Sequence, residues 1–143
     1  MSQKITLTIP ANDENTALLG LCIKGLHSLI NLSQDEHNLL YLCITEAVNN
    51  VIEHSIIDHL NSIVSVKLSF RKNKITIIVI NKGKSMNPDV LQNIKPPNID
   101  HNDIQNLPER GYGLYIINTY MDKIKYRQQG NNNYFLMVKQ LRM

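Results

Sequence analysis

The sequence has no long hydrophobic run and no recognisable targeting segment. No stretch approaches the ~20 consecutive apolar residues that a membrane-spanning helix needs. The N-terminal residues alternate apolar and polar side chains, whereas a signal peptide has a continuous apolar core followed by a cleavage site. We therefore expect a cytoplasmic protein without a membrane partner.

Large clusters of positive charge are also missing. The chain contains 15 Lys and Arg residues against 12 Asp and Glu residues, so its formal net charge is only +3. Two patches that combine aromatic and basic residues, at 70–72 and 125–127, are short. Because nucleic-acid-binding domains usually carry a larger basic patch or stripe, we expect no direct contact with nucleic acid.

Cysteine is rare in this chain. The two cysteines, Cys22 and Cys43, lie in separate apolar helical patterns. They are far from the paired spacing that zinc sites and redox motifs require. We expect both to be buried, reduced thiols.

Two widespread nucleotide-binding motifs are absent. No P-loop pattern occurs in the sequence. Gly111 and Gly113 form a Gly-x-Gly, but no strand directly precedes it and no third glycine follows, so the dinucleotide-binding fingerprint is not met. Any nucleotide site must therefore be built in another way.

What the chain does contain is typical of one globular domain. Its length of 143 residues fits the usual domain size of about 100 to 150 residues. Apolar residues make up 43% of the chain and charged residues 19%, and no low-complexity tract interrupts them. We therefore expect a single domain that spans residues 1–143.

The spacing of apolar residues predicts an α+β fold. Residues 3–9 and four later runs have the composition of strands, and two helical patterns separate the first strand from the rest. The expected order is a strand at 3–9, a helix from Asn12 or Asp13 to Asn31, a helix opened by Ser33, strands at 62–70 and 74–80, a loop, a helix after 109–114, and strands at 123–128 and 134–140. Such an order indicates a two-layer sandwich whose mostly antiparallel sheet is covered by helices on one face.

The periodic pattern fails between the strand expected at 74–80 and the helix expected after 109–114. Some 25 residues here contain four prolines and many Asn and Asp residues, although 88–94 has room for a short helix. A loop of that length in a compact domain is usually a functional lid or a disordered segment. We expect a flexible lid at about 84–110.

A polar stripe interrupts the apolar pattern of the second helix. Glu46, Asn50 and His54 recur every four residues, with Asn49 and Glu53 beside them, so they share one face. A carboxylate can accept a proton from an attacking hydroxyl, and an amide oxygen is a suitable ligand for magnesium. Each residue taken alone is more often structural.

Other groups in the chain add to this stripe. Gly111 and Gly113 open a helix whose free N–H groups and positive dipole end suit phosphate. By contrast, His54 with Glu53 or Asp58 lacks a third metal ligand at a recognisable spacing, which favours a structural histidine.

Together these stretches resemble the GHKL, or Bergerat, ATP-binding fold, and specifically the anti-sigma factor serine kinases of bacterial partner-switching systems. Glu46, Asn50 and His54 match that family's Glu-x-x-x-Asn-x-x-x-His motif. The segment from Arg110 to Leu114 matches its Gly-x-Gly motif at the end of the lid. The resemblance spans nearly the whole chain.

The resemblance implies a division of roles in a site for ATP and Mg²⁺. Glu46 would be the general base for a serine hydroxyl on a partner protein, and Asn50 the magnesium ligand. Gly111 and Gly113 would line the triphosphate with Arg110 near the γ-phosphate, while Asn81 and Gly83 occupy the adenine-binding motif. The implied partners are a STAS-type anti-sigma factor antagonist and a sigma factor or comparable regulator, and the family also forms homodimers through the first strand and its neighbouring helix.

One motif departs from the family pattern. The family has Asp where this chain has Asn81, and a second glycine where it has Ser85. Replacing a charged acceptor by a neutral one weakens a hydrogen bond by about 1 kcal/mol, or fivefold in affinity. This departure leaves one alternative open, a protein-binding switch that holds nucleotide weakly or not at all. The catalytic domain of a histidine kinase is a separate alternative.

Overall fold

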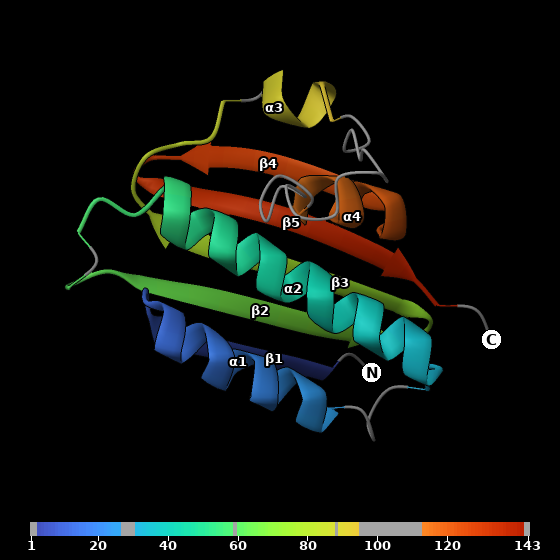
Figure 1. The fold of residues 1–143 in the computed structure, drawn as a ribbon. Helices are drawn as coiled ribbons and strands as arrows, with labels where there is room; N and C mark the ends of the chain where they lie inside the picture. Colours follow the sequence, from blue (N-terminus) through green and yellow to red (C-terminus); the bar gives the residue numbers. More distant parts are fainter. Residues whose placement is uncertain (1–2, 27–30, 59, 88, 95–112, 142–143) are drawn as a thin grey trace, which may run out of the picture.

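The computed structural model has one five-stranded sheet with helices packed on one face (Figure 1). It describes residues 3–26, 31–58, 60–87, 89–94 and 113–141. The elements are β1 (Gln3–Pro10), α1 (Asp13–Gly25), α2 (Gln34–His54), β2 (Ile63–Arg71), β3 (Lys74–Lys82), α3 (Asp89–Gln92), α4 (Gly113–Tyr120), β4 (Lys123–Gln129) and β5 (Asn132–Gln140). Within these ranges, no helix combines the length and hydropathy that crossing a membrane requires.

The sheet is antiparallel at every pairing, in the strand order β1-β2-β3-β5-β4. β5 therefore lies between β3 and β4 in the sheet, although α3, α4 and β4 separate it from β3 in the chain. Figure 1 shows α1, α2 and α4 over the same face of this sheet. The predicted two-layer α+β sandwich is confirmed.

α2 begins and ends where its sequence signals place it. The hydroxyl of Ser33 accepts from the backbone N–H of Glu36 at 3.2 Å, and the Glu36 carboxylate accepts from the backbone N–H of Ser33 at 2.9 Å. This reciprocal pair is a capping box, and it confirms the predicted start. At the other end, the N–H of Ser55 donates to Val51.

α2 buries most of its circumference against the sheet and the other helices. Its buried side chains include Cys43, Ile44 and Val48, each 0% exposed. They belong to one hydrophobic core with alternate residues of the central strand β3, of which Ile75 and Ile77 are also 0% exposed. This packing fixes α2 across the sheet, and its polar stripe is held with it.

α1 is shorter and more exposed than predicted. Asn12 caps it, as expected, but it ends at Gly25, and Asn31 lies outside any helix. Glycine is a poor helix former, which accounts for an end before the apolar pattern stops. Cys22 is exposed, so the prediction that both thiols are buried is wrong for this residue.

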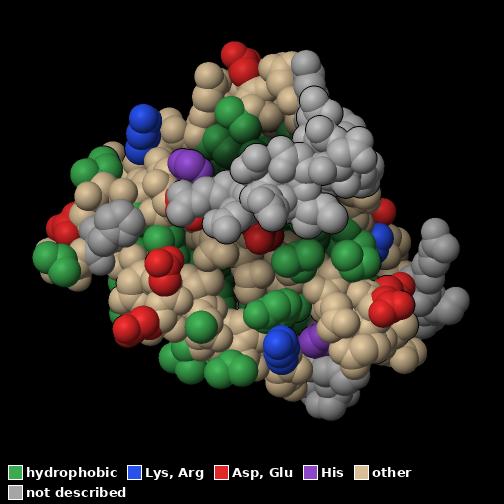
Figure 2. Space-filling view, viewed as in Figure 1, with side chains coloured by type: hydrophobic (Ala, Val, Ile, Leu, Met, Phe, Trp, Pro, Cys, Tyr) green, Lys and Arg blue, Asp and Glu red, His purple; other side chains and the backbone are tan. Residues whose placement is uncertain are grey.

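The position of α1 explains that error. It packs on the sheet with one side only, and its outer side carries apolar residues, including Leu18 and Leu21, which are 53% and 66% exposed. Figure 2 shows apolar side chains gathered over α1. Cys43 in α2 is buried as predicted, and burial raises the pKa of its thiol to about 12. Neither cysteine is in a disulfide.

Candidate functional site

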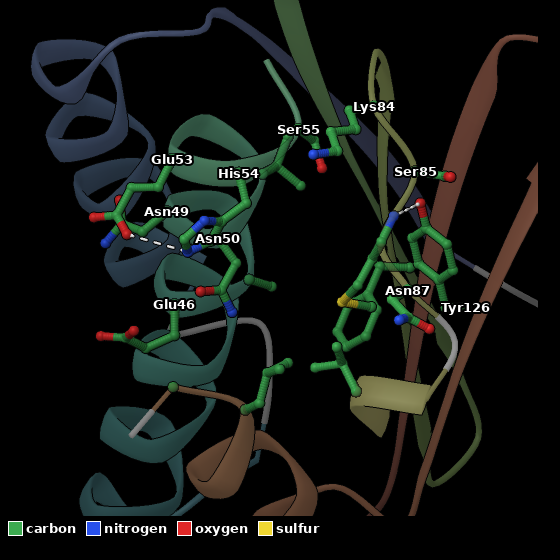
Figure 3. A pocket seen from close by; sticks show the side chains of 17 residues that line it. Glu46, Asn49, Asn50, Glu53, His54, Ser55, Lys84, Ser85, Asn87 and Tyr126 are labelled. Carbon is green, nitrogen blue, oxygen red and sulfur yellow. Dashed lines mark hydrogen bonds and ion pairs between the residues drawn. The ribbon is translucent and has the colours of Figure 1, made fainter. Parts of the chain in front are cut away.

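A cavity of about 1030 Å³ opens between α2 and the segment that follows β3. Figure 3 shows the polar residues of α2 along one side and Lys84, Ser85 and Asn87 on the other. α4 contributes Gly113 and Leu114, and the strands β4 and β5 contribute Tyr126 and Phe135. Ligand pockets usually measure about 300 to 1,000 Å³, so the cavity has room for a nucleotide.

The polar stripe of α2 lines this cavity. Glu46, Asn49, Asn50, Glu53 and His54 are all among the lining residues, and Figure 3 shows them on consecutive turns of the helix. The side-chain nitrogen of Asn50 is buried without a hydrogen-bond partner. No hydrogen bond from that nitrogen therefore fixes the orientation of the Asn50 amide. This freedom suits a ligand-binding role.

Two residues of the stripe lie at its exposed end. His54 Nε2 is 3.6 Å from a carboxylate oxygen of Glu53, and the His54 side chain is 74% exposed. Among the described residues, no group of three His, Cys, Asp or Glu side chains is placed to hold a metal ion. Asn50 could contribute an amide oxygen, which is a ligand type that magnesium accepts.

The start of α4 lies directly against the catalytic candidate. A Cβ atom at Gly113 would lie 2.6 Å from Glu46 Oε2 and 3.3 Å from Glu46 Cβ. Only glycine allows this approach without displacing the carboxylate. Glu46, Asn50 and Gly113 thus form what we call the helical end of the cavity, whereas the predicted phosphate-binding residues Arg110 and Gly111 lie outside the described residues.

The environment of Glu46 favours its protonated form. Partial burial raises the pKa of its carboxyl group above the ordinary value, and the negative charge of Glu53 raises that pKa further. A carboxylate with a raised pKa is a stronger base once it is ionised. The site therefore supports proton transfer to Glu46.

The opposite end of the cavity is formed where the chain leaves β3. The backbone N–H of Lys84 donates to the carbonyl oxygen of Ser55 at 2.9 Å, which joins this turn to the end of α2. Gly83 has a φ of 155°, and a Cβ atom there would collide with the same carbonyl oxygen. We call Ser55, Gly83 and Lys84, with the side chains directly beneath them, the strand end of the cavity.

Asn81 lies beneath this turn. It is 4% exposed and is not among the residues that line the cavity. Its side-chain nitrogen lies 3.4 Å from where a Cβ atom of Gly83 would be, and it has no hydrogen-bond partner. Asn81 therefore lies next to the cavity, and its side-chain nitrogen makes no hydrogen bond.

Several lining residues were not predicted from the sequence. Tyr126 on β4 accepts a hydrogen bond from the backbone N–H of Met86 at 2.8 Å, which fixes the start of the predicted lid to the sheet. Phe135 on β5 and Met86 itself add apolar surface. No sequence signal identifies these residues, because their meeting depends on the order of the strands. Most of the predicted lid lies outside the described residues.

Comparison with known proteins identifies the family. Residues 9–139 match the family model described as a histidine kinase-like ATPase domain. The serine-protein kinases RsbW of Bacillus mycoides and of Bacillus cereus are each 30% identical over 123 residues, covering 86% of this chain and 76% of theirs.

Solved structures with the same fold are more distant in sequence. The RsbU and RsbW domains of Rv1364c from Mycobacterium tuberculosis match with a TM-score of 0.68 at 12% identity, over 97% of this chain and 32% of that one. The SiaB–SiaC complex from Pseudomonas aeruginosa matches with a TM-score of 0.62 at 13% identity, over 94% and 88% of the two chains. From the family model and the relatives in sequence, the chain belongs to the histidine kinase-like ATPases, among the anti-sigma factor serine kinases of the GHKL fold.

Proposed function

We propose that this chain is an ATP-dependent serine-protein kinase and anti-sigma factor of a bacterial partner-switching system. Its substrate is a serine of a STAS-type antagonist, and its other partner is a sigma factor or comparable regulator. The observation that carries the proposal is the meeting of Glu46, Asn50 and Gly113 at one end of a nucleotide-sized cavity. The relatives named serine-protein kinase RsbW support the same activity.

The helical end has the groups that Mg²⁺ and a triphosphate require. Asn50 supplies an amide oxygen, a hard ligand of the kind magnesium prefers. The first N–H groups of α4, beside Gly113, are suited to phosphate, and the missing side chain lets phosphate approach the backbone closely. We place Arg110 and Gly111 at the same phosphates. When bound, Mg²⁺-ATP supplies the phosphoryl group and neutralises its developing charge.

Glu46 acts as the general base in this proposal. Its carboxylate would accept the proton of the substrate serine as the hydroxyl oxygen attacks the terminal phosphorus of ATP, and the bond from that phosphorus to the oxygen of the leaving ADP would break. Asn50 and Gly113 keep the reacting groups in place, because phosphoryl transfer depends mostly on positioning and charge. The chain is held to β4 at the start of the predicted lid, where the backbone N–H of Met86 donates to the hydroxyl of Tyr126.

We also infer a homodimer that uses β1 and α1. β1 is an edge strand of the sheet, and an edge strand offers unpaired backbone groups to another chain. Leu18 and Leu21 on the adjacent helix are exposed apolar residues that such pairing would cover. Light scattering of the wild type and of a Leu18→Glu, Leu21→Glu variant tests this part separately, and equal masses for both proteins would reject it.

The decisive experiment is phosphorylation of the antagonist with labelled ATP and Mg²⁺. We expect one labelled serine with the wild type and none with Glu46→Gln. Glu53→Gln is the matched control, since it removes a carboxylate from the same helix and the same cavity. Equal labelling by Glu46→Gln would reject the assigned base, and no calorimetric heat with millimolar ATP would favour a switch that works by protein association alone.

A further inference from the structure

The sheet has a second face that none of the described helices covers. α1, α2 and α4 lie over one face (Figure 1), and α3 contributes Val90 to the cavity on that same side. Buried residues alternate with more exposed ones along the strands, so every second side chain points to the uncovered side, which we call the open face. On it, the hydroxyl groups of Thr8 and Ser65 share a hydrogen bond of 2.9 Å.

Two adjacent strands present apolar side chains to the open face. An antiparallel sheet with one covered face usually shows polar residues on the other face. Through the middle of the open face, β1, β2 and β4 follow this rule, but β3 and β5 do not. Five half-buried residues there form what we call the apolar stripe: Ile78, Ile80, Tyr134, Leu136 and Val138.

The strand register places cations on both sides of this stripe. One cross-strand row consists, in order, of Lys67 on β2, Ile78 on β3, Leu136 on β5 and Lys125 on β4. The rows before and after it end on β4 at Lys123 and Arg127. The Arg127 guanidinium lies 5.7 Å from the centre of the Tyr134 ring. The stripe therefore runs between Lys67 and a line of three cations.

No carboxylate balances these charges within the sheet. The five strands contain no Asp or Glu. Their cations on the open face are Lys4, Lys67, Arg71, Lys74, Lys82, Lys123, Lys125 and Arg127. In the part of the chain that the structure describes, no ion pair involves any of them. The open face therefore attracts negative charge.

A purely protective role explains only part of this pattern. Lysines on an edge strand keep a sheet from pairing with other chains, and β4 is an edge strand. Lys67 and the apolar stripe, however, lie on inner strands. An apolar centre with a charged rim is typical of a protein interface. Single-stranded nucleic acid stacks on several aromatic rings, whereas Tyr134 is the one aromatic residue on the open face of the described strands.

We propose that the open face binds an acidic amphipathic α-helix of another protein. β2 and β4 are three strand spacings apart, or about 14 Å. A helix is about 10 to 12 Å wide, so one helix fits along the stripe between Lys67 and the cations of β4. Its apolar side covers the stripe, and carboxylates on its two flanks meet the cations. The cavity lies on the other side of the sheet, so this proposal does not rest on the proposed function.

The probe is a synthetic helical peptide with leucines on one side and glutamates on both flanks. Fluorescence anisotropy should show saturable binding to the full chain that weakens as salt is added, because salt screens charge. A second peptide has the same glutamates but serine in place of leucine, and it should bind at least about tenfold more weakly. Equal binding of the two peptides, or none up to about 1 mM, would overturn the proposal.

Variants locate the binding face. Lys125→Glu should weaken peptide binding about tenfold, since it turns an attraction into a repulsion. Lys24→Glu is the matched control, because it changes the net charge equally but lies on α1, and it should bind like the wild type. Ile78→Thr keeps a β-branched residue but removes apolar surface, so we expect a loss of about fivefold. Circular dichroism checks the fold, and equal losses in Lys125→Glu and Lys24→Glu would contradict the assigned face.

The same variants test other occupants of the open face. Phosphatidylserine vesicles and single-stranded oligo-dT should show no binding that depends on Lys125. If either probe binds and Lys125→Glu alone abolishes this binding, the face belongs to lipid or nucleic acid and the proposal fails. Light scattering should give equal masses for the wild type and Lys125→Glu. A lower mass for the variant would mean that a second copy of the chain occupies the face, which would also overturn the proposal.

Discussion

The two ends of the cavity are held in different ways. At the helical end, Glu46 and Asn50 are one turn apart on a single helix, and α4 approaches Glu46 through Gly113, which has no side chain. At the strand end, the polar groups come from β3, β5 and the end of α2, and backbone and amide hydrogen bonds connect them. The polar side chains of the helical end are therefore positioned by one helix, whereas those of the strand end depend on strand register.

The largest effect should come from removing the base at the helical end. Glu46→Gln should lower the rate of phosphoryl transfer by about 10²- to 10⁴-fold, because positioned proton transfer contributes about that much. ATP affinity should change little. Single-turnover labelling and calorimetry separate the two quantities. A parallel loss of ATP affinity would mean that Glu46 holds nucleotide and is not only a base.

The same variant makes a prediction about stability. The pKa of Glu46 is higher in the folded protein than in the unfolded chain, so the folded protein binds the carboxyl proton more tightly. The free energy of unfolding therefore falls as the pH rises from the unfolded pKa through the folded pKa. Glu46→Gln lacks this loss. Its Tm relative to the wild type should therefore rise between acidic and neutral pH, and a thermal melt at each pH measures it.

A smaller loss is expected when Gly113 gains a side chain. In Gly113→Ala the new methyl group would contact the Glu46 carboxylate and push it from its place. A displacement of about 1 Å can cost about 10²-fold in rate. The measurement is again single-turnover labelling, with folding checked by circular dichroism. A rate within twofold of the wild type would show that Glu46 tolerates the shift.

At the strand end, the corresponding glycine change should act on stability. Gly83→Ala would put a methyl group against the carbonyl oxygen of Ser55. Because this oxygen belongs to the backbone, it cannot easily move away. We expect a loss of about 1 to 3 kcal/mol in the free energy of unfolding. Urea denaturation measures it. Gly25→Ala is the control, since no described residue outside its own helical turn lies within 4 Å of its Cβ position and alanine favours helix, so it should be neutral or stabilising.

The smallest expected effect is a shift in pH dependence. Glu53→Gln removes a negative charge that raises the Glu46 pKa. Activity requires ionised Glu46, so the acid limb of the pH–rate profile should move to lower pH, while activity on the plateau stays unchanged. A shift to higher pH would contradict the assigned electrostatics.

The helical end could be predicted from the sequence because its spacing is local. Steps of four residues place Glu46, Asn50 and His54 on one face of any helix, and Ser33 with Glu36 marks where that helix begins. By contrast, the exposure of Cys22 could not be predicted, since an apolar helical pattern does not say which side packs on the sheet. The roles assigned to the site residues stay predictions.

The sequence by itself determined the type of most elements and the polar stripe of α2, because periodicity and capping act over a few residues. Only the tertiary structure decided the strand order, and with it the pairing of Asn81 with Asn133 and the contribution of Tyr126 to the cavity. The physical reason is that these contacts join residues 40 or more positions apart along the chain. Local propensity does not specify such contacts, which form only when the whole sheet is assembled.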